Sequence, residues 1–270
     1  MKKSTLISSF ILFAFISQVH AQENRNNPEP FKNKRGDVVT PEKGDMSLGF
    51  DAVPFIKFVG NLFNPEKSTP TSSFTAENPL TINGKYVYKE NTAVRALVRI
   101  GAGVIKSDTL VARAGSTNPA ETVSNETKTN TSNIVLGGGL QKWRGQGRVR
   151  GFYGGEILFS IQSEKTSYTY GNALSSENQS TRTKSVKPGN TFGFHLKGVV
   201  GVEYFFAEKS SISAEFGWGP QLQTRSRSEV ITESWNGSDA QSATSEGGKS
   251  SRFLFDNDNA GGSLNLNFYF

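Results

Sequence analysis

The chain has 270 residues, with 30 Lys or Arg against 24 Asp or Glu, and it contains no cysteine. The lack of cysteine excludes a disulfide framework and a thiolate metal site. The formal net charge of +6 is mild and is not gathered in a basic run, so nucleic acid is not an expected partner.

Residues 1–21 are predicted to be a secretory signal peptide. Lys2 and Lys3 form its positive start, and residues 6–16 form an apolar core that is too short to span a bilayer as a helix. Ala21 before Gln22 supplies the small-residue cleavage site, so the mature chain is expected to begin at Gln22.

Residues 22–44 are polar and rich in proline, which predicts a disordered leader. After Pro54 the period changes, and apolar residues recur at helical spacing. The spacing predicts a short helix or turn over residues 55–63. The alternative, that the first strand simply continues through Phe55 and Phe58, stays open.

From residue 45 onward, apolar and polar residues alternate in segments that are joined by short and long connectors in strict alternation. The pattern predicts an all-β fold over residues 45–270, an eight-stranded antiparallel transmembrane up-and-down β-barrel. Long, Ser/Thr/Asn-rich connectors near 55–79, 111–129, 166–188 and 234–250 are expected to be extracellular loops, with the leader and both termini in the periplasm. The predicted strands are 45–54, 80–89, 93–110, 130–143, 148–165, 189–206, 211–233 and 251–270.

Strand parity places charged residues on one face of these strands and apolar residues on the other. In a narrow barrel the charged faces converge on the lumen, where four cations and four anions would pair in a structural plug. A proton or ion path is the functional alternative. The predicted lumen network comprises Asp51, Arg95, Arg99, Arg150, Glu156, Lys197, Glu203 and Glu215.

The last residues also alternate strictly. Leu264, Leu266, Phe268 and Phe270 share one face, and Ser263, Asn265, Asn267 and Tyr269 share the other. An unpaired strand edge this apolar invites aggregation, whereas a closed barrel has no edge. Parity alone leaves a soluble sandwich with its apolar face inward equally open. Aromatic residues near the short connectors (Trp143, Tyr204, Phe205, Phe206 and 268–270) are typical of an interfacial girdle.

The ending Leu264, Leu266, Phe268 and Phe270 resembles the C-terminal signal by which bacterial outer-membrane barrels are recognised for insertion. The resemblance implies the barrel-assembly machinery and outer-membrane lipid as partners. Four further segments resemble small porin-like or OmpX-like outer-membrane β-barrel proteins of the Bacteroidota. These are patterns of glycines, aromatics and charges, and they lie at residues 44–51, 60–63, 84–95 and 150–156. They imply an architecture and a location in the cell outer membrane, and they carry no activity.

Catalytic motifs are sparse, so the protein is not expected to be an enzyme. His195 is the one histidine of the mature chain and a candidate base for a lipid-modifying enzyme at the barrel rim, but no nucleophile motif accompanies it. No phosphate- or dinucleotide-binding motif is present, so no cofactor is expected. Asp108-Thr109-Leu110 resembles a short O-glycosylation signal.

Four functions are therefore compatible with the sequence. The leading hypothesis is a barrel with a filled lumen and a structural, adhesive or accessory role, in which the long loops contact a surface ligand or partner protein. The alternatives are a narrow porin-like channel for small solutes, a lipid-modifying rim enzyme and a secreted soluble β-sandwich binding module.

Overall fold

The computed structural model describes residues 31–52, 81–118, 120–255 and 263–270. The signal peptide, its cleavage site at Ala21 and Gln22, and the helix predicted at 55–63 lie outside these residues. Within the described ranges, no helix is long and apolar enough to cross a membrane. Residues 31–270 form one compact unit.

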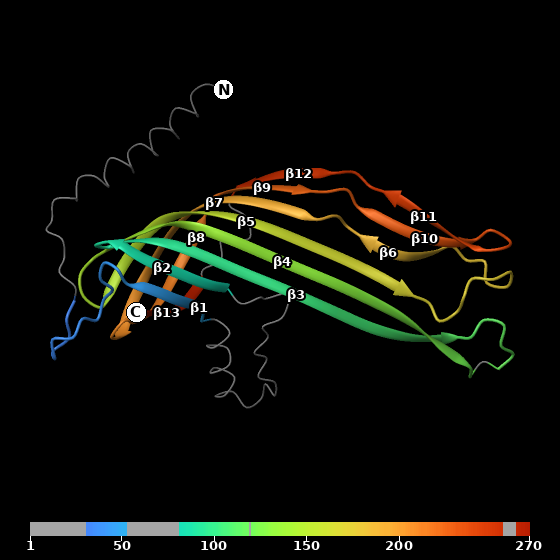
Figure 1. Cartoon of the computed structure of the whole chain (residues 1–270), viewed down its shortest axis with the longest axis horizontal. Helices are drawn as coiled ribbons and strands as arrows, with labels where there is room; N and C mark the ends of the chain where they lie inside the picture. Colours follow the sequence, from blue (N-terminus) through green and yellow to red (C-terminus); the bar gives the residue numbers. More distant parts are fainter. Residues whose placement is uncertain (1–30, 53–80, 119, 256–262) are drawn as a thin grey trace, which may run out of the picture. The chain divides into compact units, whose positions relative to one another are not determined.

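Eight antiparallel strands close into a barrel (Figure 1). Each strand pairs with its neighbours around the wall. The last strand closes the ring by pairing with the first, with Ser47 opposite Tyr269. The prediction of an eight-stranded antiparallel barrel is confirmed. The wall strands are β1 (Met46–Asp51), β2 (Thr81–Lys89), β3 (Thr92–Ala112), β4 (Thr122–Arg144), β5 (Val149–Thr169), β7 (Thr191–Ala207), β8 (Ser210–Trp218) and β13 (Ser263–Tyr269).

Tight turns join the strands at one end of the barrel. Asn91 and Lys209 adopt positive φ angles of 56° and 51° between β2 and β3 and between β7 and β8. Left-handed residues in such turns match the twist of the paired strands, which is why these hairpins are short. We call this the short-turn end.

The side chains of the wall are distributed in the reverse of the usual order, with apolar residues on the outer surface and polar residues in the interior. Large apolar residues face outward, and Phe159 and Val200 are 58% and 55% exposed. Charged and amide side chains face inward, where Glu203 is fully buried. The soluble β-sandwich is therefore wrong as an architecture, because its apolar face would be the buried one.

Three of the predicted long loops contain long stretches of strand, which corrects the sequence-based prediction. The ladder between β3 and β4 runs without a break from Thr92 opposite Lys142 to Ala112 opposite Thr122. β5 continues to Thr169, and three additional strands extend the sheet: β6 (Arg182–Lys187), β10 (Glu229–Trp235) and β11 (Ala240–Glu246). Threonine suits a strand, and a sheet with solvent on both faces needs no apolar alternation, so the pattern lacked the usual signal.

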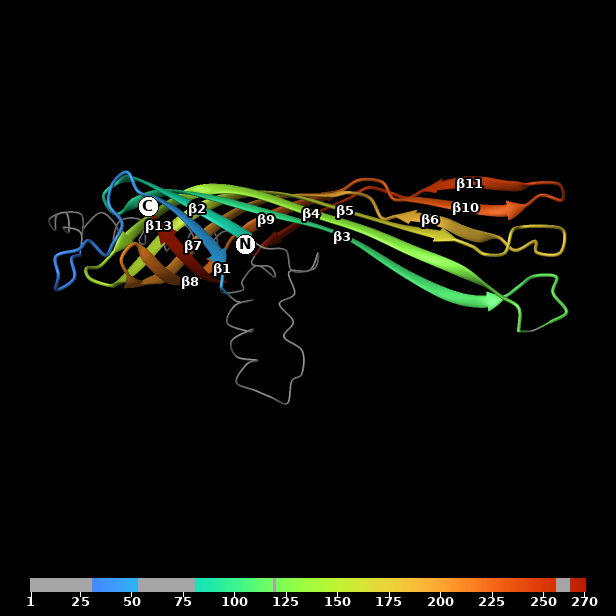
Figure 2. The ribbon, with the colours of Figure 1, turned by 60° about the horizontal axis from the view of Figure 1, so that its bottom comes forward.

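These strands and the ends of β3 (104–112), β4 (122–130) and β5 (165–169) together form what we call the extension (Figure 2). Its strand order is β11-β10-β6-β5-β4-β3. Two further strands belong to the barrel wall: β9 (Pro220–Arg225) pairs with β7, and β12 (Ser250–Phe255) pairs with β9. The predicted strands 211–233 and 251–270 are therefore each divided into shorter strands.

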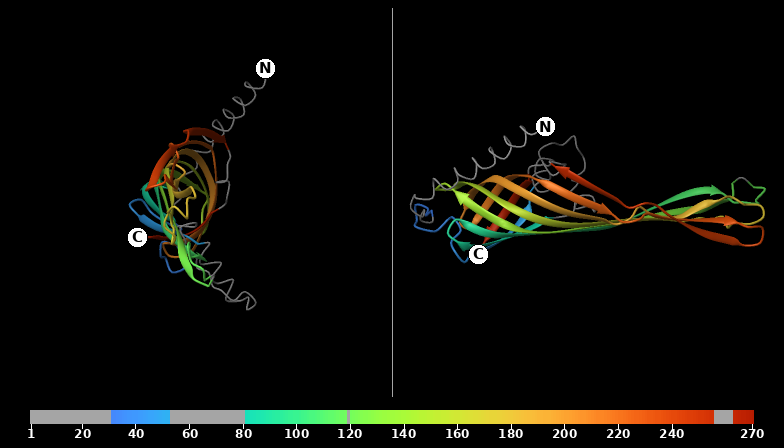
Figure 3. Two further views of the ribbon diagram at one scale, coloured as in Figure 1. Left: turned by 90° about the vertical axis from the view of Figure 1, so that its right-hand side faces the viewer. Right: turned by 90° about the horizontal axis from the view of Figure 1, so that it is seen from above.

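Three breaks separate strands of the extension from strands of the barrel wall, at residues 188–190, 226–228 and 247–249. We call the level at which they lie the junction. Asn190 and Ser226 exchange hydrogen bonds across it, with Asn190 N donating to Ser226 Oγ at 2.9 Å and Ser226 N to Asn190 O at 2.9 Å. Gly189 has a φ of +94°, and a Cβ there would lie 2.3 Å from the carbonyl oxygen of Ser226. β3, β4 and β5 pass the junction without a break (Figure 3).

Residues 31–44 differ from the expectation of a disordered leader, because they pack against the short-turn end. Val39 and Thr40 are fully buried, and Lys209 N donates to the Val39 carbonyl. We call the apolar cluster at this place the floor. Its members are Val39, Val87, Ala93, Trp143, Phe152, Phe205 and Tyr269, with Phe31 packed against them.

The floor also corrects the aromatic girdle. Trp143, Phe205 and Tyr269 are inside the barrel, whereas Tyr204, Phe206, Phe268 and Phe270 are exposed on its outer surface. Parity had already placed Tyr269 on the polar face. The inward aromatics fill the closed end, where a narrow barrel has room only for its own side chains.

Candidate functional site: the polar lumen

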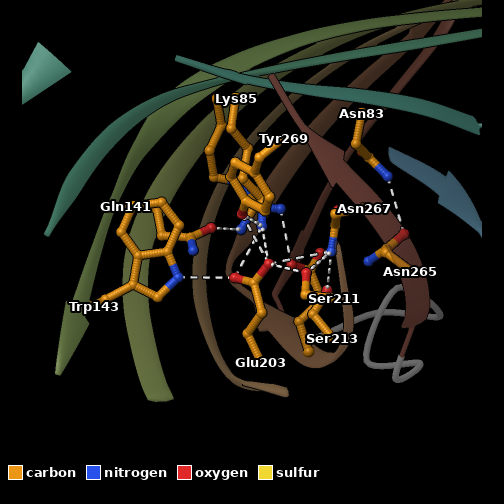
Figure 4. Close-up of polar contacts among 12 residues, drawn as sticks. Asn83, Lys85, Gln141, Trp143, Glu203, Ser211, Ser213, Asn265, Asn267 and Tyr269 are labelled. Carbon is orange, nitrogen blue, oxygen red and sulfur yellow. Dashed lines mark hydrogen bonds and ion pairs between the residues drawn. The ribbon is translucent and has the colours of Figure 1, made fainter. Parts of the chain in front are cut away.

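The floor is covered by a polar cluster that is built around the carboxylate of Glu203 on β7 (Figure 4). Trp143 Nε1 donates to Oε2 at 2.8 Å, and Tyr269 Oη and Ser211 Oγ donate to Oε1 at 2.8 and 2.6 Å. Asn267 Nδ2 adds a longer bond of 3.3 Å. Neutral donors from β4, β8 and β13 therefore converge on one buried anion, which compensates for part of its lost hydration.

Lys85 on β2 supplies the opposite charge. Its Nζ lies 3.1 Å from Glu203 Oε2 and also donates to Tyr269 Oη at 3.2 Å. The ring centroids of Trp143, Phe152 and Tyr269 lie 5.6–5.8 Å from this nitrogen. An ammonium held by a carboxylate and three aromatic rings is a fixed, satisfied ion, so this cluster acts as a structural plug.

A second layer lies beyond the first, on the side away from the floor. Arg95 Nε is 2.8 Å from Glu156 Oε1, and Arg95 Nη2 is 2.8 Å from Glu215 Oε2. Lys197 Nζ approaches the other Glu156 oxygen at 3.2 Å. Two cations and two anions from four strands thus neutralise one another across the lumen.

Glycine makes this layer possible. Gly139 on β4 stands opposite Arg95 on one side and opposite Glu156 on the other. A Cβ at this position would lie 2.8 Å from the Glu156 Cγ and 2.1 Å from the carbonyl oxygen of Gly155. The Arg95–Glu156 pair therefore bridges over a residue that has no side chain.

Arg150 differs from its expected role. It stands opposite Glu203 in the β5–β7 ladder, yet its guanidinium donates to Thr40 Oγ1 at 3.0 Å and to Asn91 Oδ1 at 3.3 Å. Arg150 thus ties residues 31–44 to the barrel wall.

A cavity of about 750 Å³ opens beyond the Arg95 layer, toward the junction. Asp51, Arg99 and His195 line it, and Lys197 and Glu215 form its base. The Nε2 atoms of His195 and Gln221 lie 2.5 Å apart. A smaller cavity of about 260 Å³ lies at the junction and shares Gln162, Gln223 and Arg252 with the larger one.

The eight predicted lumen residues therefore fall into three groups. Arg95, Glu156, Lys197 and Glu215 share one ion-pair layer, Glu203 and Arg150 lie near the floor, and Asp51 and Arg99 line the cavity. Sequence reasoning missed Lys85, the ion-pair partner of Glu203. Its signal was present, because Tyr86 and Tyr88 occupy one face of β2 while Asn83, Lys85 and Val87 occupy the other.

At the C-terminus, Phe268 and Phe270 point outward and are exposed, and Leu264 and Leu266 are half-buried on the same face. Among the described residues, no group of three or more His, Cys, Asp or Glu side chains is placed to hold a metal ion.

The extension carries its own ion-pair cluster, where Arg182 Nε and Lys184 Nζ lie 2.8 and 3.4 Å from the carboxylate of Glu233. Burial opposes ionisation of Glu233, but the hydrogen bond and charge of Arg182, with the charge of Lys184, hold the pKa of Glu233 below its usual range. The Arg182 guanidinium lies 4.3 Å from the ring centroid of Tyr170. Burial raises the pKa of Tyr170.

No protein-family model matches the chain, and no curated protein is similar to it in sequence.

Proposed function

We propose that this protein is an integral outer-membrane β-barrel that anchors a polar sheet, the extension, on the outside of the cell. The observation that carries the proposal is the reversed distribution of side chains. Exposed apolar residues ring the barrel wall, while ions and amides fill its interior. This is the arrangement of transmembrane barrels, in which only alternate residues face lipid.

Strand length supports the outward position of the extension. A strand needs about 9–11 residues to cross a bilayer, whereas β3, β4 and β5 have 21, 23 and 21 residues. The surplus lies at the end away from the short turns, which in barrels of this kind is the extracellular side. The extension is then a surface for a ligand or partner, with solvent on both faces.

The filled lumen favours an anchor over a channel. The floor, the Glu203 cluster and the Arg95 layer follow one another along the barrel axis, and each fills the lumen with buried side chains that pack or pair with one another. The resemblance of four segments and the C-terminus to small outer-membrane barrels agrees with this function. It also supports insertion by the barrel-assembly machinery.

Fractionation of cells that produce the full chain tests the location. The protein should appear in the outer membrane and should change its gel mobility on boiling, because a closed barrel resists detergent until it is heated. Protease added to intact cells should cut within the extension and leave the barrel protected. Recovery as a soluble periplasmic protein would overturn the proposal, and rapid solute entry into liposomes that carry the protein would overturn the anchor role.

A further inference from the structure

The cavity beyond the Arg95 layer has features of a binding site that the anchor role does not require. Its volume of about 750 Å³ is within the range of about 300–1,000 Å³ that is usual for small-molecule pockets. The Arg95 layer closes it on the side of the floor, so a solute that enters from the junction meets a dead end.

Two buried polar atoms on its wall lack partners. The Nε–H of Arg99 and the Oδ1 of Asn133 are shielded from solvent and make no hydrogen bond. Arg99 stands opposite Val135 on β4, two residues along from Asn133, so both side chains come from one patch of the wall. Leaving such groups unpaired costs free energy, and a ligand whose binding reorients the two side chains toward the cavity would supply an acceptor for Arg99 and a hydroxyl donor for Asn133.

The rest of the lining indicates the class of ligand. Leu97, Val135 and Leu158 provide an apolar patch beside Arg99, which fits one face of a sugar ring. The opposite wall offers amides, which both donate and accept hydrogen bonds as sugar hydroxyls require. On the opposite wall these are Gln221, Gln223 and Asn265, from β9 and β13, whereas Asn83, Asn133 and Gln162 come from β2, β4 and β5 on the same side as Arg99.

Charge restricts the ligand further. The lining holds three cations, Arg99, Lys197 and Arg252, and two anions, Asp51 and Glu215. Lys197 is engaged by Glu156, and Arg252 Nε donates to Gln223 Oε1 at 2.6 Å. With Lys197 and Arg252 engaged, one guanidinium, that of Arg99, is left among the lining cations for a ligand, which fits a single carboxylate better than a dianion such as phosphate.

From this geometry we infer that the cavity binds a small acidic sugar, a hydroxylated ring with a single carboxylate. The carboxylate lies against Arg99, the ring against Leu97 and Leu158, and the hydroxyls against Asn133 and the amides of the opposite wall. The inference is independent of what the extension contacts.

Titration calorimetry on the full chain, folded in detergent, tests the inference with sodium glucuronate as the probe. Glucuronate should bind, while glucose, acetate and inorganic phosphate should each bind at least tenfold more weakly. Heat-modifiable mobility identifies folded protein in every sample, so the result does not depend on where the protein resides in the cell. No glucuronate binding, or equal binding of glucose or phosphate, would overturn the inference.

Variants locate the site. Arg99→Gln should weaken glucuronate binding about tenfold or more, because it removes a charge-assisted hydrogen bond. Arg113→Gln is the matched control just beyond the far end of β3, where Arg113 forms an exposed pair with Glu121, and it should bind as the unaltered chain does. If Arg99→Gln does not fold, Asn133→Ala replaces it, with an expected loss of several-fold. Unchanged binding in either folded variant would place glucuronate elsewhere and overturn the assignment.

Discussion

Single residues in the lumen depend on one another, because the ions of the Glu203 cluster and the Arg95 layer are neutralised by neighbours rather than by water. Glu156 is the clearest case, since it holds both Arg95 and Lys197 and its side chain is only 2% exposed. Glu156→Ala should therefore destabilise the barrel by about 3–5 kcal/mol. Glu121→Ala, which breaks an exposed pair in the extension, should cost about 0–1 kcal/mol.

Urea unfolding followed by the mobility shift on gels measures both variants. Equal unfolding midpoints would contradict the buried pairing of residue 156.

Gly139 permits a different test at the same scale. Gly139→Ala should lower the unfolding midpoint, because the new methyl group would push the Arg95–Glu156 pair and the Gly155 carbonyl apart. Gly138→Ala is the control in the adjacent position, where the nearest atom to a Cβ is 3.7 Å away. A loss of stability as large in Gly138→Ala would mean that loss of strand glycine, not the crowded pair, is responsible.

The sequence predicted individual residues well where parity alone decided the answer. The inward face of β13 and the members of the Arg95 layer follow from alternation. Which residues pair with one another could not be predicted, because pairing depends on the position of each side chain along the barrel axis. Arg150 and Glu203 are neighbours in the ladder, yet Arg150 bonds to Thr40 in the segment before β1, and Glu203 pairs with Lys85 on β2.

Among the elements, the paired strands β6 and β10 should be sensitive to acid. The pKa of Glu233 is depressed in the folded state, so its pairing with Arg182 and Lys184 stabilises these strands above the unfolded pKa of about 4.5 and is lost as the pH falls through the folded pKa. The hydrogen-exchange protection factors of residues 182–187 and 229–235, taken relative to the intrinsic exchange rate at each pH, should therefore fall below about pH 4.5.

Glu233→Gln provides the control. In this variant the protection factors of the same residues should already be low at neutral pH and should change little further on acidification. An unaltered chain whose exchange in these strands does not respond to acid would contradict the role of the pair.

The strand β13 should tolerate no charge on its outward face. Phe268→Asp should reduce assembly into the membrane, because a carboxylate would replace an exposed aromatic on the surface that we assign to lipid, where charged substitutions are destabilising. Ser245→Asp on β11 should assemble normally, since it adds the same charge to the polar extension. The yield of heat-modifiable protein in membranes measures both, and normal assembly of Phe268→Asp would reverse the assignment of faces.

The extension is the element that sequence reasoning did not find. Residues 122–130 and 240–246 contain few apolar residues, and the search for strands depended on an apolar face. The strands are held by ladder hydrogen bonds to neighbours that already extend from the barrel, such as β4 beside β3. That support comes from the tertiary arrangement and leaves no local signature.

For the whole molecule, the lumen has two successive closures, and removing one should not open it. Deletion of residues 31–43 takes away Val39 and Thr40 and exposes the floor, so the barrel should melt at a lower temperature. Liposomes that carry this variant should remain as impermeable as those with the full chain, because the Arg95 layer stays in place. Rapid swelling would show that residues 31–43 alone close the barrel.

The junction also has a mechanical consequence. Tension applied at the tip of the extension reaches the barrel along β3, β4 and β5, because among the described strands these run through the junction unbroken. Their hydrogen bonds lie perpendicular to the direction of pull, so many bonds must shear at once before the ladder slips. β10 and β11 end at the junction and have shorter ladders, so fewer hydrogen bonds share the load there. Under such tension, the side of the extension formed by β3, β4 and β5, which continue into the barrel wall, should therefore resist a greater force than the side formed by β10 and β11.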